Sequence, residues 1–254
     1  MDKKIIIKNF SRAAGLYDRY ADIQKISALE LLGRINQNGF HKILEIGCGT
    51  GAYTHLLREK FNETQLKAVD ISAKMVEVAQ NKLKDKKIDF VAADAEHICF
   101  DDKFDLITSN ACFQWFEDLE KALIKYKNML NRNGTLSFSV FGPLTFRELD
   151  ASLKSLFKRT SVGAAYFITK EKLKILLEKN FKEARIEEKR YQERFSQLSD
   201  LLKKIKYTGA NGAGLNTGNF FGPQQLKKLE TIYLNRFKHI RATYQIFFCQ
   251  GLKP

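Results

Sequence analysis

A glycine-rich segment in the first quarter of the chain carries the clearest chemical signal. The segment LEIGCGTG, residues 44–51, places Gly47, Gly49 and Gly51 directly after an apolar run and before a helical pattern. Such a turn lets the backbone approach a ligand closely, and the helix N-terminus can hold an anionic group. A phosphate loop would need Lys-Ser or Lys-Thr after its last glycine, and a dinucleotide loop would place its third glycine one residue later. The segment therefore predicts a ligand loop of neither of these types.

Two acidic residues follow at the ends of the next two predicted strands. Asp70 closes the run LKAVD, 19 residues after Gly51, and Asp94 closes the run IDFVAAD. A carboxylate at the tip of the second strand can accept hydrogen bonds from both hydroxyls of a ribose. Asp70 could instead cap the next helix, but Ser72 suits that role better, and Asp94 could be an ordinary loop residue. Together with the glycine segment, the pattern predicts a nucleoside site.

Alternating strands and helices have to position these residues. Apolar runs predict five strands, over residues 42–47, 66–71, 88–94, 104–110 and 135–142. Helical patterns between them cover residues 52–61, 72–86 and 118–134, the last closed by Gly134. Continuous apolar strands that alternate with helices indicate a parallel sheet covered on both faces. We therefore expect a doubly wound α/β fold.

The chain before and after this alternation has other patterns. Residues 10–35 predict a helix that ends at Asn38-Gly39. Beyond Gly142 the pattern predicts helices over 144–160, 169–181, 196–209 and 224–239, strands over 182–195 and 242–251, and a Gly/Asn-rich loop over 210–223. No repeat or Pro/Ser-rich linker divides the chain. We expect a single domain, 1–254, made of N-terminal helices (1–38), a ligand-binding core (39–142) and a cap with the last two strands (143–254).

The form E-x-G-x-G-x-G, residues 45–51, resembles motif I of class I methyltransferases. The resemblance implies a seven-stranded, mostly parallel sheet and the cofactor S-adenosylmethionine, converted to S-adenosylhomocysteine, with no metal. It implies that Asp70 binds the ribose, and that Asp94 with the backbone of Ala95 meets the adenine. The segment SNACFQWF, residues 109–116, would line the methionine and methyl end. That segment lacks Asn-Pro-Pro-Tyr and Asn-Pro-Pro-Phe, which argues against methylation of adenine N6 or amide nitrogen.

A narrower resemblance lies at the two ends of the chain. The segment FSRAAGLYDRYADIQ, residues 10–24, resembles the opening of the malonyl-acyl-carrier-protein O-methyltransferases, in which an N-terminal helix folds over the cofactor as a lid. Residues 201–212 and 242–251 resemble the C-terminal half of that family, so the similarity spans about residues 10–250. The resemblance implies methyl transfer to the free carboxylate of a malonyl group on acyl carrier protein. The methyl ester would prime pimeloyl synthesis for biotin.

The motifs and the resemblance assign one set of residues to the cofactor: Arg12, Tyr17, Gln24, Glu45, Gly47, Cys48, Gly49, Gly51, Asp70, Ile71, Met75, Asp94, Ala95, Asn110, Ala111 and Gln114. A malonyl carboxylate is ionised near pH 7, so methyl transfer needs alignment and exclusion of water but no general base. A cation or hydrogen bonds must still orient this carboxylate. The candidates for orienting the acceptor are Tyr17, Trp115 and Arg147. Trp115 could instead belong to the core, and Arg147 to a helix surface.

The net charge is +14, and the excess of positive charge lies in the C-terminal part. Residues 1–142 contain 21 Lys and Arg against 19 Asp and Glu, whereas residues 143–254 contain 22 against 10. A one-sided basic surface attracts an acidic macromolecule, and the resemblance implies an acidic acyl carrier protein. A solvated Lys-rich surface without a partner is the alternative. The predicted carrier contacts are Lys203, Lys204, Lys206, Arg236, Lys238 and Arg241.

Other functions stay open at this stage. One is a class I methyltransferase of another small carboxylic acid or a quinone intermediate. Another is an RNA methyltransferase, which the charge suits but which lacks a catalytic Cys pair or an RNA-binding module here; nucleic acid is therefore the less favoured partner. A third is a non-catalytic protein that binds S-adenosylmethionine. Apolar runs are too short for a membrane span or a signal peptide, so we expect a cytoplasmic protein. The Cys and His residues show no metal-site spacing.

Overall fold

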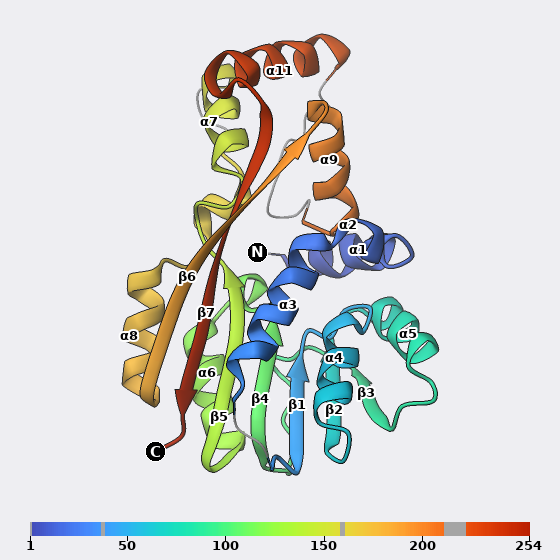
Figure 1. Ribbon diagram of the computed structural model, residues 1–254, viewed down its shortest axis with the longest axis vertical. Coiled ribbons are helices and arrows are strands. Elements are labelled where there is room, and N and C mark those ends of the chain that lie inside the picture. Colours follow the sequence, from blue (N-terminus) through green and yellow to red (C-terminus); the bar gives the residue numbers. More distant parts are fainter. Residues whose placement is uncertain (1, 37–38, 158–160, 211–221) are drawn as a thin grey trace.

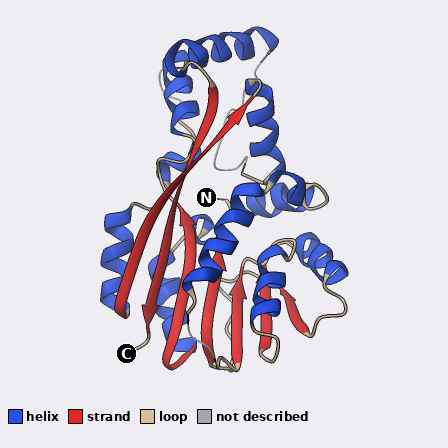
Figure 2. Cartoon of the chain, viewed as in Figure 1, coloured by secondary structure: helices blue, strands red, loops and turns tan. Residues whose placement is uncertain are grey.

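The computed structural model describes residues 2–36, 39–157, 161–210 and 222–254, which contain a seven-stranded sheet in the order β3-β2-β1-β4-β5-β7-β6 (Figures 1 and 2). The strands are β1 (Lys42–Ile46), β2 (Gln65–Asp70), β3 (Ile88–Ala92), β4 (Phe104–Asn110), β5 (Leu130–Phe141), β6 (Lys182–Phe195) and β7 (Ile240–Leu252). Neighbouring strands from β3 to β5 are parallel, and β7 runs antiparallel between β5 and β6. The predicted doubly wound, mostly parallel sheet is confirmed.

Helices cover both faces of this sheet. The helices α3 (Asp22–Arg34) and α4 (Ala52–Lys60) pack on one face, and α6 (Leu119–Met129) and α8 (Lys170–Asn180) pack on the other. The adjacent residues Ile43 and Leu44 of β1 enter these two opposite cores, because successive strand side chains point to opposite faces. The Ile43-Leu44 pair thus makes the middle of β1 apolar on both faces.

The N-terminal region differs from the single predicted helix. It forms α1 (Lys3–Ala13), the short α2 (Tyr17–Tyr20) and α3, with turns between them. Asp2 caps α1 by accepting a hydrogen bond from the Lys4 N–H at 2.8 Å. The apolar spacing of this region is continuous, so the pattern did not predict the bends, which let α1 and α2 turn away from α3 (Figure 1).

The end of α6 also differs from the prediction. The helix ends at Met129, whereas Gly134 lies within β5. The register between β4 and β5 shifts between the pairs Phe104–Leu130 and Leu106–Thr135. A Cβ at Gly134 would approach the Asn131 carbonyl oxygen to 2.9 Å. The glycine therefore allows this irregular entry into the strand and does not cap the helix.

The last two strands carry a cap beyond the sheet. β7 pairs with β5 from Ile246 to Leu252, but its ladder with β6 continues to Ile240. The helices α7 (Arg147–Leu156), α9 (Leu198–Tyr207) and α11 (Pro223–Phe237) gather around this two-stranded extension (Figure 1). Glu148 joins α7 to β7, since its carboxylate accepts hydrogen bonds from the Thr243 N–H at 3.0 Å and hydroxyl at 2.6 Å.

Some predicted features lie outside the described residues. These are the helix end at Asn38, the last residues of the predicted helix over 144–160, and nearly all of the Gly/Asn-rich loop over 210–223. Among the helices that the structure describes, none has the length and apolar character required to cross a membrane.

Candidate active site

A cavity lies where the carboxyl ends of the central strands meet the N-terminal helices. Its empty volume is about 700 Å³, including space open to solvent. The loops after β1 to β4 form one side, and α1 and Tyr17 form the other. The lining residues are Lys3, Ile6, Phe10, Tyr17, Gly47, Gly49, Val69, Asp70, Ile71, Met75, Asp94, Ala95, Glu96, Asn110, Ala111, Cys112, Trp115 and Phe116. Ligands bind at this edge in doubly wound sheets.

A side chain would meet different surroundings at each of the three glycines of the loop. All three have positive φ, which favours glycine. A Cβ at Gly47 would overlap the Cys112 Sγ, whereas a Cβ at Gly49 would meet no atom within 4 Å. Gly49 therefore leaves open space on the cavity side. A Cβ at Gly51 would lie 3.1 Å from the Ala79 Cβ. Gly51 thus allows the packing of α4 on α5 (Ala73–Lys82) and does not line the cavity, contrary to its predicted ligand contact.

Asp70 is held rigidly at the tip of β2. Its Oδ1 accepts a hydrogen bond from the Ser72 N–H at 2.8 Å, and its Oδ2 accepts one from the Gly49 N–H at 2.9 Å. Burial raises the pKa of Asp70, and these two hydrogen bonds oppose the rise. Ser72 itself caps α5, accepting from the Met75 N–H, as predicted. The Asp70 carboxylate therefore has a fixed orientation with lone pairs left for a ligand.

Asp94 follows β3, lines the same cavity and already has several partners. Its Oδ2 accepts a hydrogen bond from the Lys3 ammonium at 2.6 Å and lies 2.8 Å from the His97 Nδ1. Its Oδ1 accepts from the Glu96 N–H at 2.9 Å. Burial opposes ionisation, but these hydrogen bonds prevail and lower the pKa of Asp94. Lys3 also lies 2.7 Å from the Glu96 carboxylate, so a residue of α1 bridges two acidic side chains of the cavity wall.

The N-terminal segment (Lys3–Tyr20) lies over the first cavity and contacts three loops of the core. Beyond the Lys3 contacts, the hydroxyls of Ser11 and Ser72 lie 2.9 Å apart. The Asp18 carboxylate accepts a hydrogen bond from the Thr50 hydroxyl of the glycine loop at 2.5 Å and pairs with Lys82. These contacts adjoin the loops after β3, β2 and β1 respectively. The segment therefore closes the cavity on the side away from the sheet.

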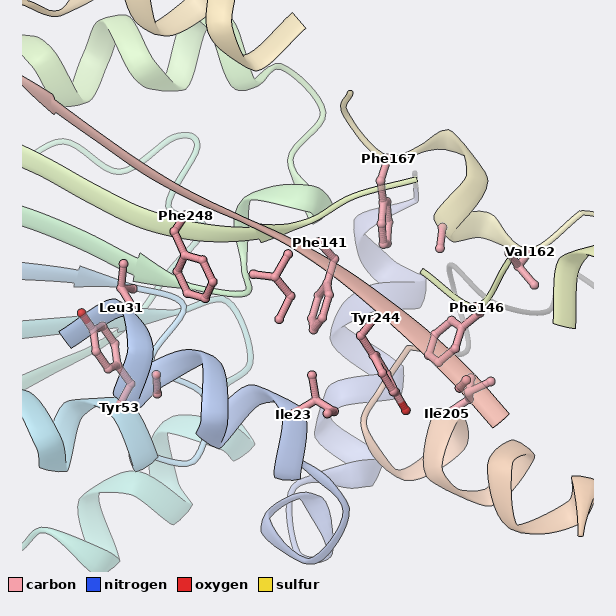
Figure 3. Packing of buried hydrophobic residues seen from close by; sticks show 14 of the residues in the cluster. Ile23, Leu31, Tyr53, Phe141, Phe146, Val162, Phe167, Ile205, Tyr244 and Phe248 are labelled. Atoms are coloured by element: carbon pink, nitrogen blue, oxygen red, sulfur yellow. The ribbon is translucent and has the colours of Figure 1, made fainter. Parts of the chain in front are cut away.

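A second cavity adjoins the first on the cap side. Its empty volume is about 570 Å³, and it is lined by Phe10, Tyr17, Gln24, Ala111, Gln114, Trp115, Phe141, Thr145, Phe146, Ala164, Phe167, Lys204, Ile205, Thr208, Ala210 and Tyr244. Figure 3 shows Phe141, Phe146, Phe167, Ile205 and Tyr244 gathered around the end of β7. Four lining residues belong to both cavities: Phe10, Tyr17, Ala111 and Trp115. The two cavities therefore share a wall.

Tyr17 and Trp115 form the polar and aromatic parts of this shared wall. Phe10 stands edge-on to Trp115 with 5.6 Å between ring centroids, and Trp115 stands edge-on to Phe167 at 5.8 Å. Burial, followed by the nearby Asp70 charge, raises the pKa of Tyr17, so its hydroxyl stays protonated. Trp115, a candidate for either core or acceptor site, lines both cavities, as does Tyr17.

Most residues assigned to the cofactor lie around these cavities. Ten line the first cavity: Tyr17, Gly47, Gly49, Asp70, Ile71, Met75, Asp94, Ala95, Asn110 and Ala111. Gln24 and Gln114 line the second cavity, and Cys48 lines a smaller one behind the glycine loop. Asn110 is held in place because its Nδ2 donates to the Gln24 carbonyl at 3.0 Å and its Oδ1 accepts from the Ser139 hydroxyl at 2.7 Å.

Arg12 and Glu45, like Gly51, line none of these three cavities. Arg12 is exposed on α1 and is not among the lining residues. Glu45 is buried beneath the glycine loop, and its Oε2 has no hydrogen-bond partner among the described residues. Burial raises the pKa of Glu45 to about 8, with an opposing effect from the Thr54 hydroxyl. The position of Glu45 favours a role beneath the loop over direct ligand contact.

Two basic residues lie elsewhere than predicted. The Arg147 Nε lies 3.3 Å from the Glu148 carboxylate, and Arg147 lines neither cavity, so the acceptor-side position expected for it is not found. Lys204, predicted to contact a carrier protein, has a side chain only 7% exposed and lines the second cavity. The amphipathic α9 turns Lys204 inward. Lys203 and Lys206, its neighbours on that helix, remain exposed.

Arg236 and Lys238 are also exposed, near the end of α11. Arg241 is partly buried, with its Nε 3.7 Å from the Glu148 carboxylate. Four of the six predicted carrier contacts, Lys203, Lys206, Arg236 and Lys238, are thus available at the surface of the cap.

Some residues of the site could not be predicted from the sequence, because only distant packing brings them together. Lys3 and Glu96 lack a motif, and their meeting depends on where α1 lies. The second cavity takes Phe141, Thr145 and Tyr244 from strand ends and loops that are separated by about a hundred residues. The apolar character of β5 and β7 was visible in the sequence, but it did not tell which aromatic side chains would face a cavity.

The fold is that of the class I methyltransferases, and the first cavity lies at the sheet edge where doubly wound folds bind their ligands. The family model described as "Methyltransferase domain" matches residues 44–138. Solved structures share the fold: the YcgJ protein from Bacillus subtilis (TM-score 0.62, 16% identity, 90% of this chain and 98% of that one) and a phosphoethanolamine N-methyltransferase 2 from Haemonchus contortus in complex with S-adenosyl-L-methionine (TM-score 0.58, 19% identity, 89% and 52%).

Relatives of known name narrow this class. The "Malonyl-[acyl-carrier protein] O-methyltransferase 1" of Ilyobacter polytropus is 35% identical over 93% of this chain and 88% of its own length. The enzyme of the same family from Acetivibrio thermocellus is 33% identical over 100% and 95%, and that of Priestia megaterium is 33% identical over 96% and 95%. The chain belongs to the malonyl-[acyl-carrier protein] O-methyltransferase family.

Proposed function

We propose that this enzyme transfers a methyl group from S-adenosylmethionine to the free carboxylate of a malonyl group on acyl carrier protein. The first cavity would hold the cofactor, and the second would hold the malonyl group. The observation that carries the proposal is their shared wall of Phe10, Tyr17, Ala111 and Trp115. The four shared residues make the two cavities adjacent, and in-line transfer requires a donor and an acceptor that are held next to each other.

The residues around the first cavity fit the chemical groups of the cofactor. A carboxylate offers about four lone-pair sites, and backbone N–H groups of Gly49 and Ser72 occupy two of those on Asp70. The remaining two suit the hydroxyls of a ribose. Open space beside Gly49 suits an elongated amino-acid chain, and Asp94 with Ala95, which follow β3, suits an adenine edge. No metal is part of the proposal.

The chain's own residues would position the acceptor rather than take a proton from it. The cofactor supplies an electrophilic sulfonium methyl group with a neutral thioether leaving group. The ionised malonyl carboxylate is already a nucleophile, so Tyr17, whose pKa is raised, would act as a hydrogen-bond donor and not as a base. The aromatic side chains of Trp115 and Phe167 would exclude water from the carboxylate.

The carrier protein would approach the cap. Lys203, Lys206, Arg236 and Lys238 are exposed there, and an acidic carrier would be attracted to this positive charge. The expected signature is a KM for malonyl-acyl carrier protein that rises with salt, while the affinity for the cofactor changes little. We also propose that the enzyme is cytoplasmic. We propose that its single domain consists of an N-terminal lid, a core and a cap.

Mass spectrometry of malonyl-acyl carrier protein after incubation with the enzyme and S-adenosylmethionine tests the proposal. The expected result is the addition of one methyl group, removed by mild ester hydrolysis. Absence of this product, with cofactor binding intact by calorimetry, would reject the acceptor and retain the methyltransferase. The next acceptors to assay would be other small carboxylic acids and quinone intermediates, followed by RNA.

A further inference from the structure

Lys204 has an unusual place for a lysine. Its side chain is only 7% exposed, although it belongs to the strongly basic part of the chain. It projects from α9 to the second cavity, beside Ile205 and Tyr244, which Figure 3 shows at the meeting of α9 and β7. Among the described residues that line this cavity, Lys204 alone carries a charged side chain. An anionic group that entered the cavity would meet this ammonium as its one charged neighbour in the wall.

The ammonium is held by partners that come from other elements. Its Nζ donates to the Asp22 Oδ2 at 2.9 Å and to the Glu193 Oε1 at 2.6 Å. The Glu193 Oε2 in turn accepts a hydrogen bond from the Tyr244 hydroxyl at 3.2 Å. Neither carboxylate lines the cavity. An ammonium has three N–H donors, of which two are used by Asp22 and Glu193 and the third is used by neither carboxylate.

We propose that Lys204 binds and orients the malonyl carboxylate, taking the role that the sequence analysis had assigned to Arg147. This inference rests on the proposed function. One carboxylate oxygen would accept the third N–H of Lys204, and the other would be directed toward the shared wall at Tyr17 and Trp115. The methyl group then forms its bond to that oxygen as the bond from carbon to the sulfonium sulfur breaks. The carboxylate loses its negative charge, the sulfonium loses its positive charge, and no proton moves.

The two acidic partners of Lys204 suit this reaction. The nucleophile loses its charge as the ester forms, so a strong cation beside it would stabilise the ground state more than the transition state. Glu193 and Asp22 together carry two negative charges against the single positive charge of Lys204, so the ammonium offers the cavity a fixed hydrogen-bond donor and no net positive field. Lys204 is thus suited to orienting the carboxylate without slowing its attack. The ester product is neutral, so it accepts a weaker hydrogen bond from the Lys204 ammonium.

The test compares two ligands on the same carrier. In the presence of S-adenosylhomocysteine, the dissociation constants of malonyl-acyl carrier protein and of its methyl ester are measured by calorimetry. The wild-type enzyme is expected to bind the malonyl form at least tenfold more tightly. Lys204→Met is expected to reduce this ratio to within twofold of one, with an unchanged affinity for S-adenosylhomocysteine. A ratio preserved in Lys204→Met would overturn the inference.

Two further variants separate recognition from structure. Lys204→Gln retains a side-chain donor for Asp22 and Glu193 and serves if Lys204→Met does not fold; the ratio should fall equally. Glu193→Gln breaks the same ion pair but keeps the ammonium, so the ratio should be kept or increased. A collapse of the ratio in Glu193→Gln would assign the effect to the lost ion pair and reject the inference. A purely structural role would weaken the binding of both ligands alike.

The failures of the two proposals can be told apart. If wild-type enzyme adds no methyl group to malonyl-acyl carrier protein, the proposed function is wrong and the inference falls with it. If wild-type enzyme does so, and Lys204→Met keeps both its malonyl preference and its KM, the inference alone is wrong. Lys172→Met, an exposed lysine on α8 on the far side of the sheet from the N-terminal helices, controls for the loss of one charge and should leave every value unchanged.

Discussion

The two cavities of this enzyme are built in different ways. The first takes most of its wall from residues within a few positions of the ends of β1 to β4, and its Asp70 carboxylate is held by backbone N–H groups. The second draws on α1, α3, the loop after β4, the end of β5, α9 and β7, and its wall is largely aromatic. The first cavity can thus be built largely from local sequence, whereas the second requires the whole fold.

A buried glutamate in each region illustrates the same difference. Glu45, beneath the first cavity, has an oxygen without a partner among the described residues, and burial raises the pKa of this carboxyl to about 8. Glu148, beneath the cap, accepts two hydrogen bonds from Thr243 and lies near Arg147 and Arg241. Burial thus favours the protonated form of Glu45, whereas the Glu148 carboxylate joins α7 to β7.

The largest effect is expected at Asp70, where Asp70→Ala should remove cofactor binding and leave the cap intact. Loss of two hydrogen bonds to a charged group amounts to about 4 kcal/mol, roughly a thousandfold in affinity. Calorimetric titration with S-adenosylmethionine measures it, with Asp89→Ala on the exposed edge of the sheet as the control. Binding close to that of the wild type would refute the ribose role of Asp70.

A smaller effect, on stability, is expected at Glu148. Glu148→Ala would leave the buried Thr243 N–H without its acceptor and remove the partner of Arg147 and Arg241. We expect a loss of about 3 kcal/mol in the free energy of unfolding, measured by urea denaturation. Cofactor affinity should change little, because the first cavity does not include this region. An equal loss of cofactor affinity would show that cap and core do not behave as separate structural units.

Glu45 should make stability depend on pH. The folded chain holds the Glu45 proton up to a pKa of about 8, whereas the carboxyl of an unfolded chain releases it near its ordinary pKa of 4.5. Stability from this group is therefore complete below pH 4.5 and is lost as the pH rises through 8. We expect the free energy of unfolding to fall by about 2 kcal/mol over this pH range, because the protein relaxes around the ionised side chain and limits the cost of burying its charge. Glu45→Gln should flatten this part of the curve in thermal melts of the cofactor-free enzyme between pH 5 and pH 9; an unchanged slope would contradict the raised pKa.

The smallest effect is expected where the N-terminal segment meets the core. Lys3→Met removes the bridge to Asp94 and Glu96 while it keeps the length of the side chain. Ion pairs of this kind, partly exposed, contribute about 1 kcal/mol, so the dissociation rate of S-adenosylhomocysteine should rise about fivefold. Stopped-flow displacement measures it, with the exposed Lys8→Met on the same helix as the control. Equal rates in both variants would mean that this contact does not hold the segment closed.

Much of the fold and of the first cavity could be predicted from the sequence. The apolar runs from residue 42 to residue 142 correspond to β1–β5, because parallel strands buried on both faces must be continuously apolar. Asp70 and Asp94 were found because the end of such a strand has a known place in a doubly wound sheet. The exceptions were local. Gly134 entered β5 through an irregular register, and the N-terminal region bent twice where its apolar spacing was continuous.

The sequence by itself therefore determined the class of fold, the ligand loop and the acidic groups at the strand ends, since each depends on neighbours along the chain. The tertiary structure alone decided that Lys3 meets Asp94, that Lys204 faces inward between Asp22 and Glu193, and that Arg147 does not line the acceptor cavity. The packing of a helix fixes the direction in which each of its charged side chains points. It also fixes which side chain, some 90 or 180 residues away, becomes the partner of that charge. Local pattern does not contain that information, because packing is a property of the assembled elements.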